Sequence, residues 1–433
     1  MDRLGVVDEI FLRTHRGLGT PIALQGLWRT VDRVEPALLH RIHGALRPGP
    51  LGRRVIRSRV PGARRAWQPN VRAHPLDFME STLPLDELLP WADTLGAGLD
   101  PEFGPAWRLA ARWLADGGSV VALTCSHALA DARGLVHAVD AALREVVDGA
   151  AAAHAVSADA GRPEAEVEAG DARSRCARES EWADAFRQWS TVVGGTIRAL
   201  RHGIPERPAP EEPVRAGADE LRVHGAVVQF RADEWDRVAG EQGGTANSLF
   251  IHLVATLLWD IGFPLPAIAA SLPVDTRDEP RVDNDLAMTE IVVDRADTPA
   301  TLRKKARAAY EHRMSSPGGM PEQLLQVIPD RWAHALAKGA GERDILCSNI
   351  GTLPDSLRTI GGHPCVGVAA RAIHPGLTAA RLPRTRLSGY LCRSGDGYIL
   401  SLIGLDPGIE SGSALAELAV HAASRLGLDG HPW

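Results

Sequence analysis

Residues 119–135 read SVVALTCSHALADARGL and bring together an apolar strand pattern, a histidine and an acid. The run Ser119–Thr124 is short and apolar, which indicates a buried strand. After Arg133 the apolar residues recur at helical spacing, so a helix is expected to follow the turn. The pattern therefore places His127 at the end of a buried strand, with Asp131 four residues later. A neutral imidazole held there can accept a proton from a hydroxyl or an amine near neutral pH.

The segment Ser126–Ala132 (SHALADA) resembles the HHxxxDG signature of thioester-dependent acyltransferases. That superfamily includes nonribosomal-peptide condensation domains, wax ester synthase/diacylglycerol acyltransferase-like proteins and, more distantly, chloramphenicol acetyltransferase. The resemblance implies that His127 is the catalytic histidine. Two positions depart from the signature, because Ser126 replaces its first histidine and Ala132 replaces its glycine. The short pattern HxxxD is equally compatible with a structural histidine.

A second segment extends the resemblance towards the C-terminus. LPVDTR at residues 272–277 is similar to the PVxxR element of the family, in which the arginine pairs with the signature aspartate. The resemblance implies an Arg277–Asp131 pair, and a guanidinium can hold a carboxylate through two hydrogen bonds. Asp131 would then be structural: it would hold the loop that orients His127.

A third segment, SNIGTLP at residues 348–354, is similar to a family element in the corresponding place. The resemblance implies that Ser348 and Asn349 donate hydrogen bonds to a developing oxyanion, while a strand end turning at a glycine is the alternative. Asn247 lies where wax-ester-synthase-like proteins carry an Asn-Asp pair, which implies a position near the substrate tunnel; a helix N-cap is the alternative. The residues expected at the tunnel or the oxyanion are therefore Ser126, Asn247, Ser348 and Asn349.

The resemblance implies an α/β (α+β) fold of two chloramphenicol-acetyltransferase-like subdomains, set in a V as a pseudo-dimer with a central tunnel. The N-terminal half is expected to span residues 1–175 and the C-terminal half residues 176–433. Residues 148–175 are rich in Ala, Gly and acidic residues, which predicts a flexible insertion within the first half. Residues 179–200 then show the periodicity of an amphipathic helix.

The chemistry implied by the family is acyl transfer between two substrates that meet at His127. An acyl thioester, carried by coenzyme A or by the phosphopantetheine of a carrier protein, enters from one side, and an acceptor alcohol or amine enters from the other. His127 accepts or orients the acceptor proton. We expect no metal and no tightly bound cofactor; the partners are an acyl or peptidyl carrier protein or acyl-coenzyme A.

Three functional interpretations stay open at this point. The first is a free-standing condensation-type acyltransferase of small-molecule or natural-product biosynthesis. The second is a wax ester or diacylglycerol type of lipid O-acyltransferase. The third is a degenerate, non-catalytic relative that binds a carrier protein, which the altered signature motivates.

Composition excludes several other classes of protein. The 433 residues are 45% hydrophobic and 24% charged, as in ordinary globular proteins, and the net charge of −6 gives no sign of nucleic-acid binding. The most apolar window, residues 248–259, is too short to span a bilayer. We therefore expect a cytoplasmic protein without a transmembrane segment, and a monomer, as is common for this fold.

The five cysteines are widely spaced and form no CxxC pair, which argues against a disulfide framework or a zinc site and fits a reducing compartment. Cys125 lies two residues before His127 and is the alternative nucleophile. No charged residue adjoins it to lower its pKa, so a small core thiol is the expected role.

Overall fold

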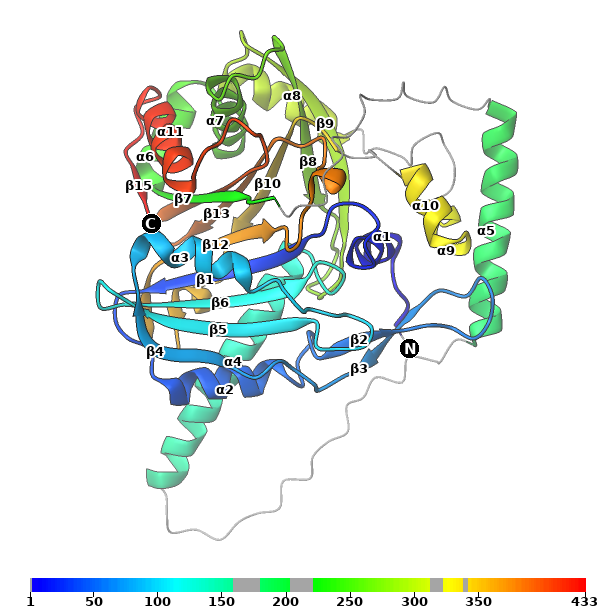
Figure 1. Ribbon diagram of the computed structural model, residues 1–433, viewed down its shortest axis with the longest axis horizontal. Coiled ribbons are helices and arrows are strands. Elements are labelled where there is room, and N and C mark those ends of the chain that lie inside the picture. The colour runs from blue at the N-terminus through cyan, green and yellow to red at the C-terminus, as the bar shows by residue number, and fades with distance from the viewer. Residues whose placement is uncertain (1, 159–179, 203–220, 312–321, 338–341) are drawn as a thin grey trace.

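Two mixed sheets organise the chain in the computed structural model, which describes residues 2–158, 180–202, 221–311, 322–337 and 342–433 (Figure 1). The six strands of the first sheet run in the order β11 (Thr359–Ile360), β12 (His363–Ile373), β1 (Ala23–Thr30), β6 (Ser119–Ser126), β5 (Trp107–Leu114) and β4 (Asp77–Leu83). The seven strands of the second run in the order β15 (Gly430–Pro432), β7 (His224–Arg231), β14 (Gly397–Gly404), β13 (Leu387–Ser394), β10 (Ile345–Thr352), β8 (Ala267–Asp275) and β9 (Leu286–Asp294). Strands β2 (Arg53–Ile56) and β3 (Ala66–Pro69) form a separate ribbon.

Helices flank both sheets. Those of the N-terminal part are α1 (Val6–His15), α2 (Pro36–Leu46), α3 (Leu88–Thr94), α4 (Ala132–Ala158) and α5 (Glu181–His202), with the 3-10 turn η1 (Leu85–Glu87). Those of the C-terminal part are α6 (Ala232–Glu241), α7 (Ala246–Asp260), α8 (Pro299–Glu311), α9 (Leu324–Val327), α10 (Asp330–Ala337) and α11 (Gly412–Ser424), with the 3-10 turns η3 (Asp355–Arg358) and η4 (Ala379–Arg381).

Strand β6 is the centre of the first sheet, and every one of its residues is buried. It pairs antiparallel with β1 on one side and with β5 on the other, and residues 115–118 close the β5–β6 hairpin. Its continuous apolar run follows from this position, because both faces of a central strand are covered. Apolar side chains of α2 and α4 complete the core around it, among them Leu38, Leu39, Leu135 and Val139.

Strand β12 returns from the second half of the chain into the first sheet. Its residues pair antiparallel with β1 from Ala23–Ile373 to Thr30–Cys365. Strand β1 is therefore a central strand, flanked by a neighbour from each half of the sequence. The expected division at residues 175 and 176 does not separate the two sheets, because β11 and β12 lie after it and belong to the first.

One local expectation needs correction, and a second is confirmed with its apolar face turned to the surface. Helix α4 extends to Ala158, so the expected insertion at residues 148–175 begins as helix, and its later part, residues 159–175, lies outside the described residues. Helix α5 forms where an amphipathic helix is expected, but it turns Trp182, Phe186 and Trp189 outwards at 73%, 78% and 47% exposure. Its inner face is polar in part, since Asp184 is fully buried and bound to Arg64.

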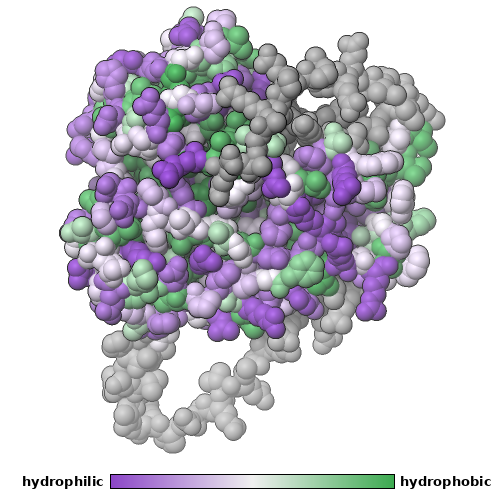
Figure 2. Space-filling view, viewed as in Figure 1, coloured by the Kyte–Doolittle hydropathy of each residue, from purple (hydrophilic) through white to green (hydrophobic). Residues whose placement is uncertain are grey.

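Helix α5 stands at the edge of the molecule, away from both sheets (Figure 1). Apolar side chains reach the surface along that edge (Figure 2). Within the described ranges, no helix is both long and apolar enough to cross a membrane.

Candidate active site

His127 lies on the turn that follows β6. Ser126, the last residue of the strand, pairs with Ala23 of β1, and the amide of Leu129 donates to the Ser126 carbonyl to close the turn. The imidazole is partly buried and stacks on the ring of Phe11 in α1, with 3.5 Å between ring centroids and 11° between ring planes. The strand and helix α1 together therefore fix where the ring lies and which way its plane faces.

Asn284, which lies in the loop between β8 and β9, holds the Nδ1 atom of His127. Its Oδ1 lies 3.0 Å from Nδ1, while its Nδ2 donates to the carboxylate of Asp8 at 2.9 Å and to the backbone carbonyl of His127 at 2.8 Å. Because both of those partners accept hydrogen bonds, Nδ2 must face them and Oδ1 must face the imidazole. Oδ1 then accepts from a protonated Nδ1, which leaves the lone pair on Nε2.

The surroundings of His127 keep the imidazole neutral. Burial lowers the pKa of His127 to about 4, against the opposing effects of its own backbone, the Asp131 charge and the hydrogen bond to Asn284. His374, at the end of β12, also acts to lower this pKa. At neutral pH the ring is therefore a hydrogen-bond acceptor at Nε2 and not an imidazolium.

Asp131 caps the helix that follows the turn. Its Oδ1 accepts from the amide of Gly134 at 2.8 Å and from Nη2 of Arg277 at 2.6 Å, and its Oδ2 accepts from the amide of Asp285 at 3.0 Å. Both charged side chains are nearly inaccessible, at 6% for Asp131 and 4% for Arg277. The ion pair that the resemblance implies is thus present, and it connects the first turn of α4 to the loop after β8.

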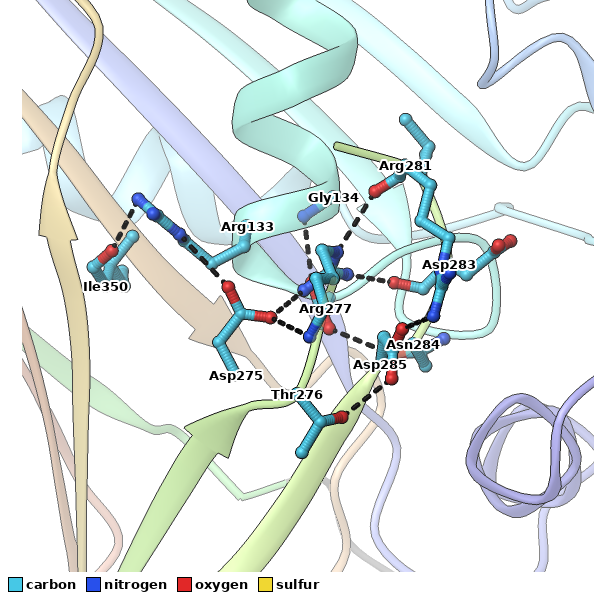
Figure 3. A network of polar contacts seen from close by, with 12 residues as sticks. Arg133, Gly134, Asp275, Thr276, Arg277, Arg281, Asp283, Asn284, Asp285 and Ile350 are labelled. Carbon is cyan, nitrogen blue, oxygen red and sulfur yellow. Dashed lines mark hydrogen bonds and ion pairs between the residues drawn. The ribbon is translucent and has the colours of Figure 1, made fainter. Parts of the chain in front are cut away.

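Arg277 makes further contacts that fix its guanidinium (Figure 3). It binds Asp275 at 2.7 Å and donates to the carbonyls of Arg281, at 3.1 Å, and Asp283. Burial acts to lower the pKa of Arg277, but hydrogen bonds and charges from Asp131 and Asp275 outweigh it and raise the pKa. The arginine therefore stays charged and holds the β8–β9 loop, including Asn284, against the turn that carries His127.

The two departures from the signature have structural explanations. Ser126 is buried, and its hydroxyl accepts from the amide of Ala128 at 3.3 Å, so it supports the turn. Ala132 lies in the first turn of α4, and no described residue other than glycine has a positive φ. Alanine at this position therefore causes no backbone strain, since a helical position accepts alanine readily.

Two of the three remaining candidates, Asn247 and Asn349, form a separate hydrogen-bonded pair. Nδ2 of Asn349 donates to Oδ1 of Asn247 at 3.0 Å, and Nδ2 of Asn247 donates to the hydroxyl of Tyr310 at 2.9 Å. Thr245, not Asn247, caps α7, because its side chain accepts from the amide of Ser248. Ser348 precedes Asn349 on β10 and is partly buried. Within the described chain, the side chain of His127 has a hydrogen bond with Asn284 and a ring stack with Phe11, and none of these three side chains is hydrogen-bonded to it.

Cys125 is not positioned as a nucleophile. Its side chain is completely buried, and burial raises its pKa to about 12. The thiol is therefore a small core group, as its neighbours in the sequence indicate. The described residues also contain no cluster of three or more His, Cys, Asp or Glu side chains that could hold a metal ion.

Three residues on which this geometry depends were not predicted from the sequence. Asn284 lies between Asp283 and Asp285, outside the three segments that carry the resemblance. Phe11 and Asp8 lie in an amphipathic segment near the N-terminus that carries no motif. Their roles depend on contacts across more than 100 residues of sequence, which periodicity does not report.

Comparison with known proteins identifies the fold. No family model matches the chain, and no curated protein sequence does. Among solved structures, the first condensation domain of the CDA synthetase aligns with a TM-score of 0.59 and 14% identity, covering 97% of this chain and 95% of that one. Polyketide synthase associated protein 5 from Mycobacterium tuberculosis aligns with a TM-score of 0.56 and 13% identity, covering 98% of both chains.

A third structure is the starter condensation domain of rhizomide synthetase in complex with C8-CoA and Leu-SNAC. It aligns with a TM-score of 0.56 and 12% identity, covering 98% of this chain and 93% of that one. The chain therefore has the mixed α/β fold of condensation domains, with two sheets as the resemblance implies. Sequence identity this low establishes the fold alone and does not assign a reaction to the chain.

Proposed function

We propose that this protein is a condensation-type acyltransferase, which moves an acyl group from a thioester to an alcohol or amine acceptor. The proposal is carried by the 3.0 Å contact between His127 Nδ1 and Asn284, which leaves Nε2 of a neutral imidazole free to accept a hydrogen bond. The condensation-domain fold supports this assignment, since structural neighbours include a starter domain bound to C8-CoA.

In the proposed reaction the acceptor O–H or N–H donates to Nε2 of His127 while its oxygen or nitrogen attacks the thioester carbonyl. The tetrahedral intermediate then collapses, the C–S bond breaks, and the proton passes to the departing thiolate. Because burial lowers the pKa of His127, the imidazole orients the acceptor and relays its proton without storing it for long. Asp131 and Arg277 support the loop and do not contact the reacting atoms.

Ser348 and Asn349 are proposed to face the developing oxyanion from β10, with Asn247 beside them. The hydrogen bond from Asn349 to Asn247 supports a fixed orientation for that amide. Removing one oxyanion donor costs about 100-fold to 1,000-fold in kcat in other acyl-transfer enzymes. Asn349→Ala should therefore lower kcat by at least about 10-fold with little change in KM if this assignment is correct. The central tunnel, the monomeric state and the cytoplasmic location stay predictions.

Intact-mass spectrometry with two loaded donors tests the proposed reaction. Wild type and His127→Ala are incubated with acyl-coenzyme A or an acyl-loaded carrier protein, together with a panel of alcohols and amines. Acceptor-dependent loss of the acyl group by wild type alone is the expected result. Equal loss with both proteins would remove His127 from the mechanism, and no turnover with either, alongside carrier-protein binding, would support the non-catalytic interpretation.

Lipid O-acyl transfer is a second candidate, favoured by one observation. Helix α5 exposes the large apolar side chains Trp182, Phe186 and Trp189, and side chains of this kind are typical of proteins that work at lipid interfaces. Long-chain alcohols and diacylglycerol in the same acceptor panel separate the two candidates. Turnover restricted to these acceptors would favour lipid acyl transfer over the condensation of a small polar acceptor.

A further inference from the structure

Asp8, in the first turn of α1, is a buried carboxylate that takes part in the active-site hydrogen bonds from the far end of the chain. Its side chain is 2% exposed, and Asn284 lies 276 residues away in sequence. Oδ1 of Asp8 accepts from Nδ2 of Asn284 at 2.9 Å and from the Asn284 amide at 3.2 Å. Oδ2 accepts from the amide of Gly5 at 2.8 Å, so both oxygens are engaged.

The carboxylate determines which way the amide of Asn284 points. An ionised carboxylate only accepts hydrogen bonds, so it requires the N–H side of the amide. The carbonyl of His127 requires the same side, at 2.8 Å from Nδ2. With the amide held in this orientation, Oδ1 of Asn284 selects the His127 tautomer that is protonated on Nδ1. A group at Asp8 able to donate a hydrogen bond would remove half of that constraint.

Charged groups on three elements face this carboxylate. Arg53 of β2 favours the charged form, and Asp283, which Arg53 binds at 2.8 Å, opposes it. Glu9, next to Asp8 on α1, is engaged by Arg65 and does not share these partners. Burial outweighs the hydrogen bonds and charges that favour ionisation and raises the pKa of Asp8 to about 6. The carboxylate therefore ionises within the range in which most enzymes are assayed.

We propose that Asp8 is a positioning residue for the proposed acyl transfer: its carboxylate orients the amide of Asn284, which in turn holds His127 in the tautomer that accepts at Nε2. The proposal rests on the proposed function, but it concerns a hydrogen-bond chain that exists without substrate. Ionisation of Asp8 then controls how much of the protein carries the competent imidazole. Neither Asp8 nor Asn284 needs to contact the substrate for this effect.

The tautomer of His127 can be measured directly by NMR of the full-length protein labelled with 15N-histidine. In wild type at pH 7.5 we expect the His127 nitrogen shifts of an Nδ1-protonated neutral ring. Asp8→Asn can donate to Oδ1 of Asn284, so the amide can turn over, and a large share of the Nε2-protonated tautomer should appear. His127→Gln assigns the signal. An unchanged tautomer in Asp8→Asn would overturn the proposal.

Asp184→Asn is the matched control, because Asp184 is also a fully buried carboxylate but binds Arg64 and not the His127 chain. It should leave the His127 tautomer and the pH profile unchanged. If Asp8→Asn does not fold, wild type alone decides the question: the Nδ1-protonated share should fall as pH drops through about 6. A share that stays constant from pH 7.5 to pH 5 would contradict the proposal.

Turnover gives an independent readout once a substrate pair is known. Wild-type kcat/KM should fall as pH drops through about 6, and Asp8→Asn should lose that pH dependence and lose activity in proportion to its share of the Nε2-protonated tautomer, since a base in the wrong tautomer has no lone pair to offer. A loss of activity with the pH 6 limb retained would overturn the proposal. The NMR result stands even if no acyl transfer is found, so failure of the proposed function is distinguishable.

Discussion

At the scale of single residues, the candidate active site places a partly buried imidazole and a buried carboxylate, with opposite pKa shifts, at the two ends of one hydrogen-bond chain. Burial lowers the pKa of His127 to about 4 and raises the pKa of Asp8 to about 6, because each loses hydration of its charged form. Asn284 lies between them and contacts both. From the sequence alone we expect His127 to accept a proton near neutral pH, because the local pattern does not show how deeply the ring is buried.

These shifts predict stability changes of opposite sign. The folded pKa of Asp8 lies above its unfolded value of 3.8, so its contribution to stability is complete below pH 3.8 and is lost as pH rises through 6. The folded pKa of His127 lies below 6.5, so its contribution is complete above pH 6.5 and is lost as pH falls towards 4. Asp8→Asn should therefore be more destabilising at pH 4.5 than at pH 7, and His127→Gln the reverse. Urea unfolding at both pH values measures the destabilisation caused by each variant. If the destabilisation changes with pH in the same direction for both variants, the prediction is contradicted.

Removing one partner of the buried Arg277–Asp131 pair should lower the free energy of unfolding by a large amount. Arg277→Ala leaves Asp131 without its charge partner, and an uncompensated buried charge costs about 3–5 kcal/mol. The control is Arg237→Ala, which breaks the exposed pair with Glu241 on α6 and should cost less than about 0.5 kcal/mol. Free energies of unfolding from urea titration compare the two. Similar small losses would mean that the pair does not stabilise the loop.

At the scale of elements, the first turn of α4 contacts the loop between β8 and β9 of the second sheet. A Cβ at Gly134 would lie 3.3 Å from the guanidinium of Arg277 and 3.2 Å from the carbonyl of Asp283. The absence of a side chain there lets the loop approach the helix closely. The sequence predicted the helix from its apolar periodicity, but periodicity does not identify which helical glycine lies under a neighbouring loop.

A pair of glycine substitutions on α4 separates helix propensity from this close approach. Gly149→Ala meets nothing within 4 Å and should raise the free energy of unfolding by up to about 1 kcal/mol through helix propensity. Gly134→Ala gains the same propensity but crowds Arg277 and Asp283, so it should be neutral or destabilising and should slow acyl transfer. Thermal unfolding of both variants provides the comparison. An equal increase in stability for both variants would show that the loop moves to accommodate the added methyl group.

At the scale of the whole molecule, strand β12 joins the two halves into one structure. It comes from the C-terminal half, yet it pairs along its length with β1 of the first sheet. The Arg277–Asp131 pair and the bond from Arg133 to the carbonyl of Ile350 at 3.0 Å add further links between the two sheets. The candidate active site lies where these links meet, so its geometry depends on both halves.

This connectivity predicts that the N-terminal half does not fold alone. A fragment of residues 1–175 lacks β11 and β12, which leaves β1 as an unpaired edge and uncovers its apolar residues. We expect the fragment to be poorly structured by circular dichroism and the full chain to unfold in one calorimetric transition. Two separate transitions, or a well-folded fragment, would contradict the prediction.

Local periodicity and motif spacing were enough to predict the strand, turn and helix around His127 and the resemblance that indicates the fold. The sequence also indicated the Arg277–Asp131 pair, since the resemblance joined two distant motifs. Three further features required the tertiary structure: β12 completes the first sheet, α5 turns its apolar face outwards, and Asp8 and Asn284 form one hydrogen-bond chain with His127. Those features depend on burial and on contacts between residues far apart in the chain, and neither quantity is encoded in the local pattern.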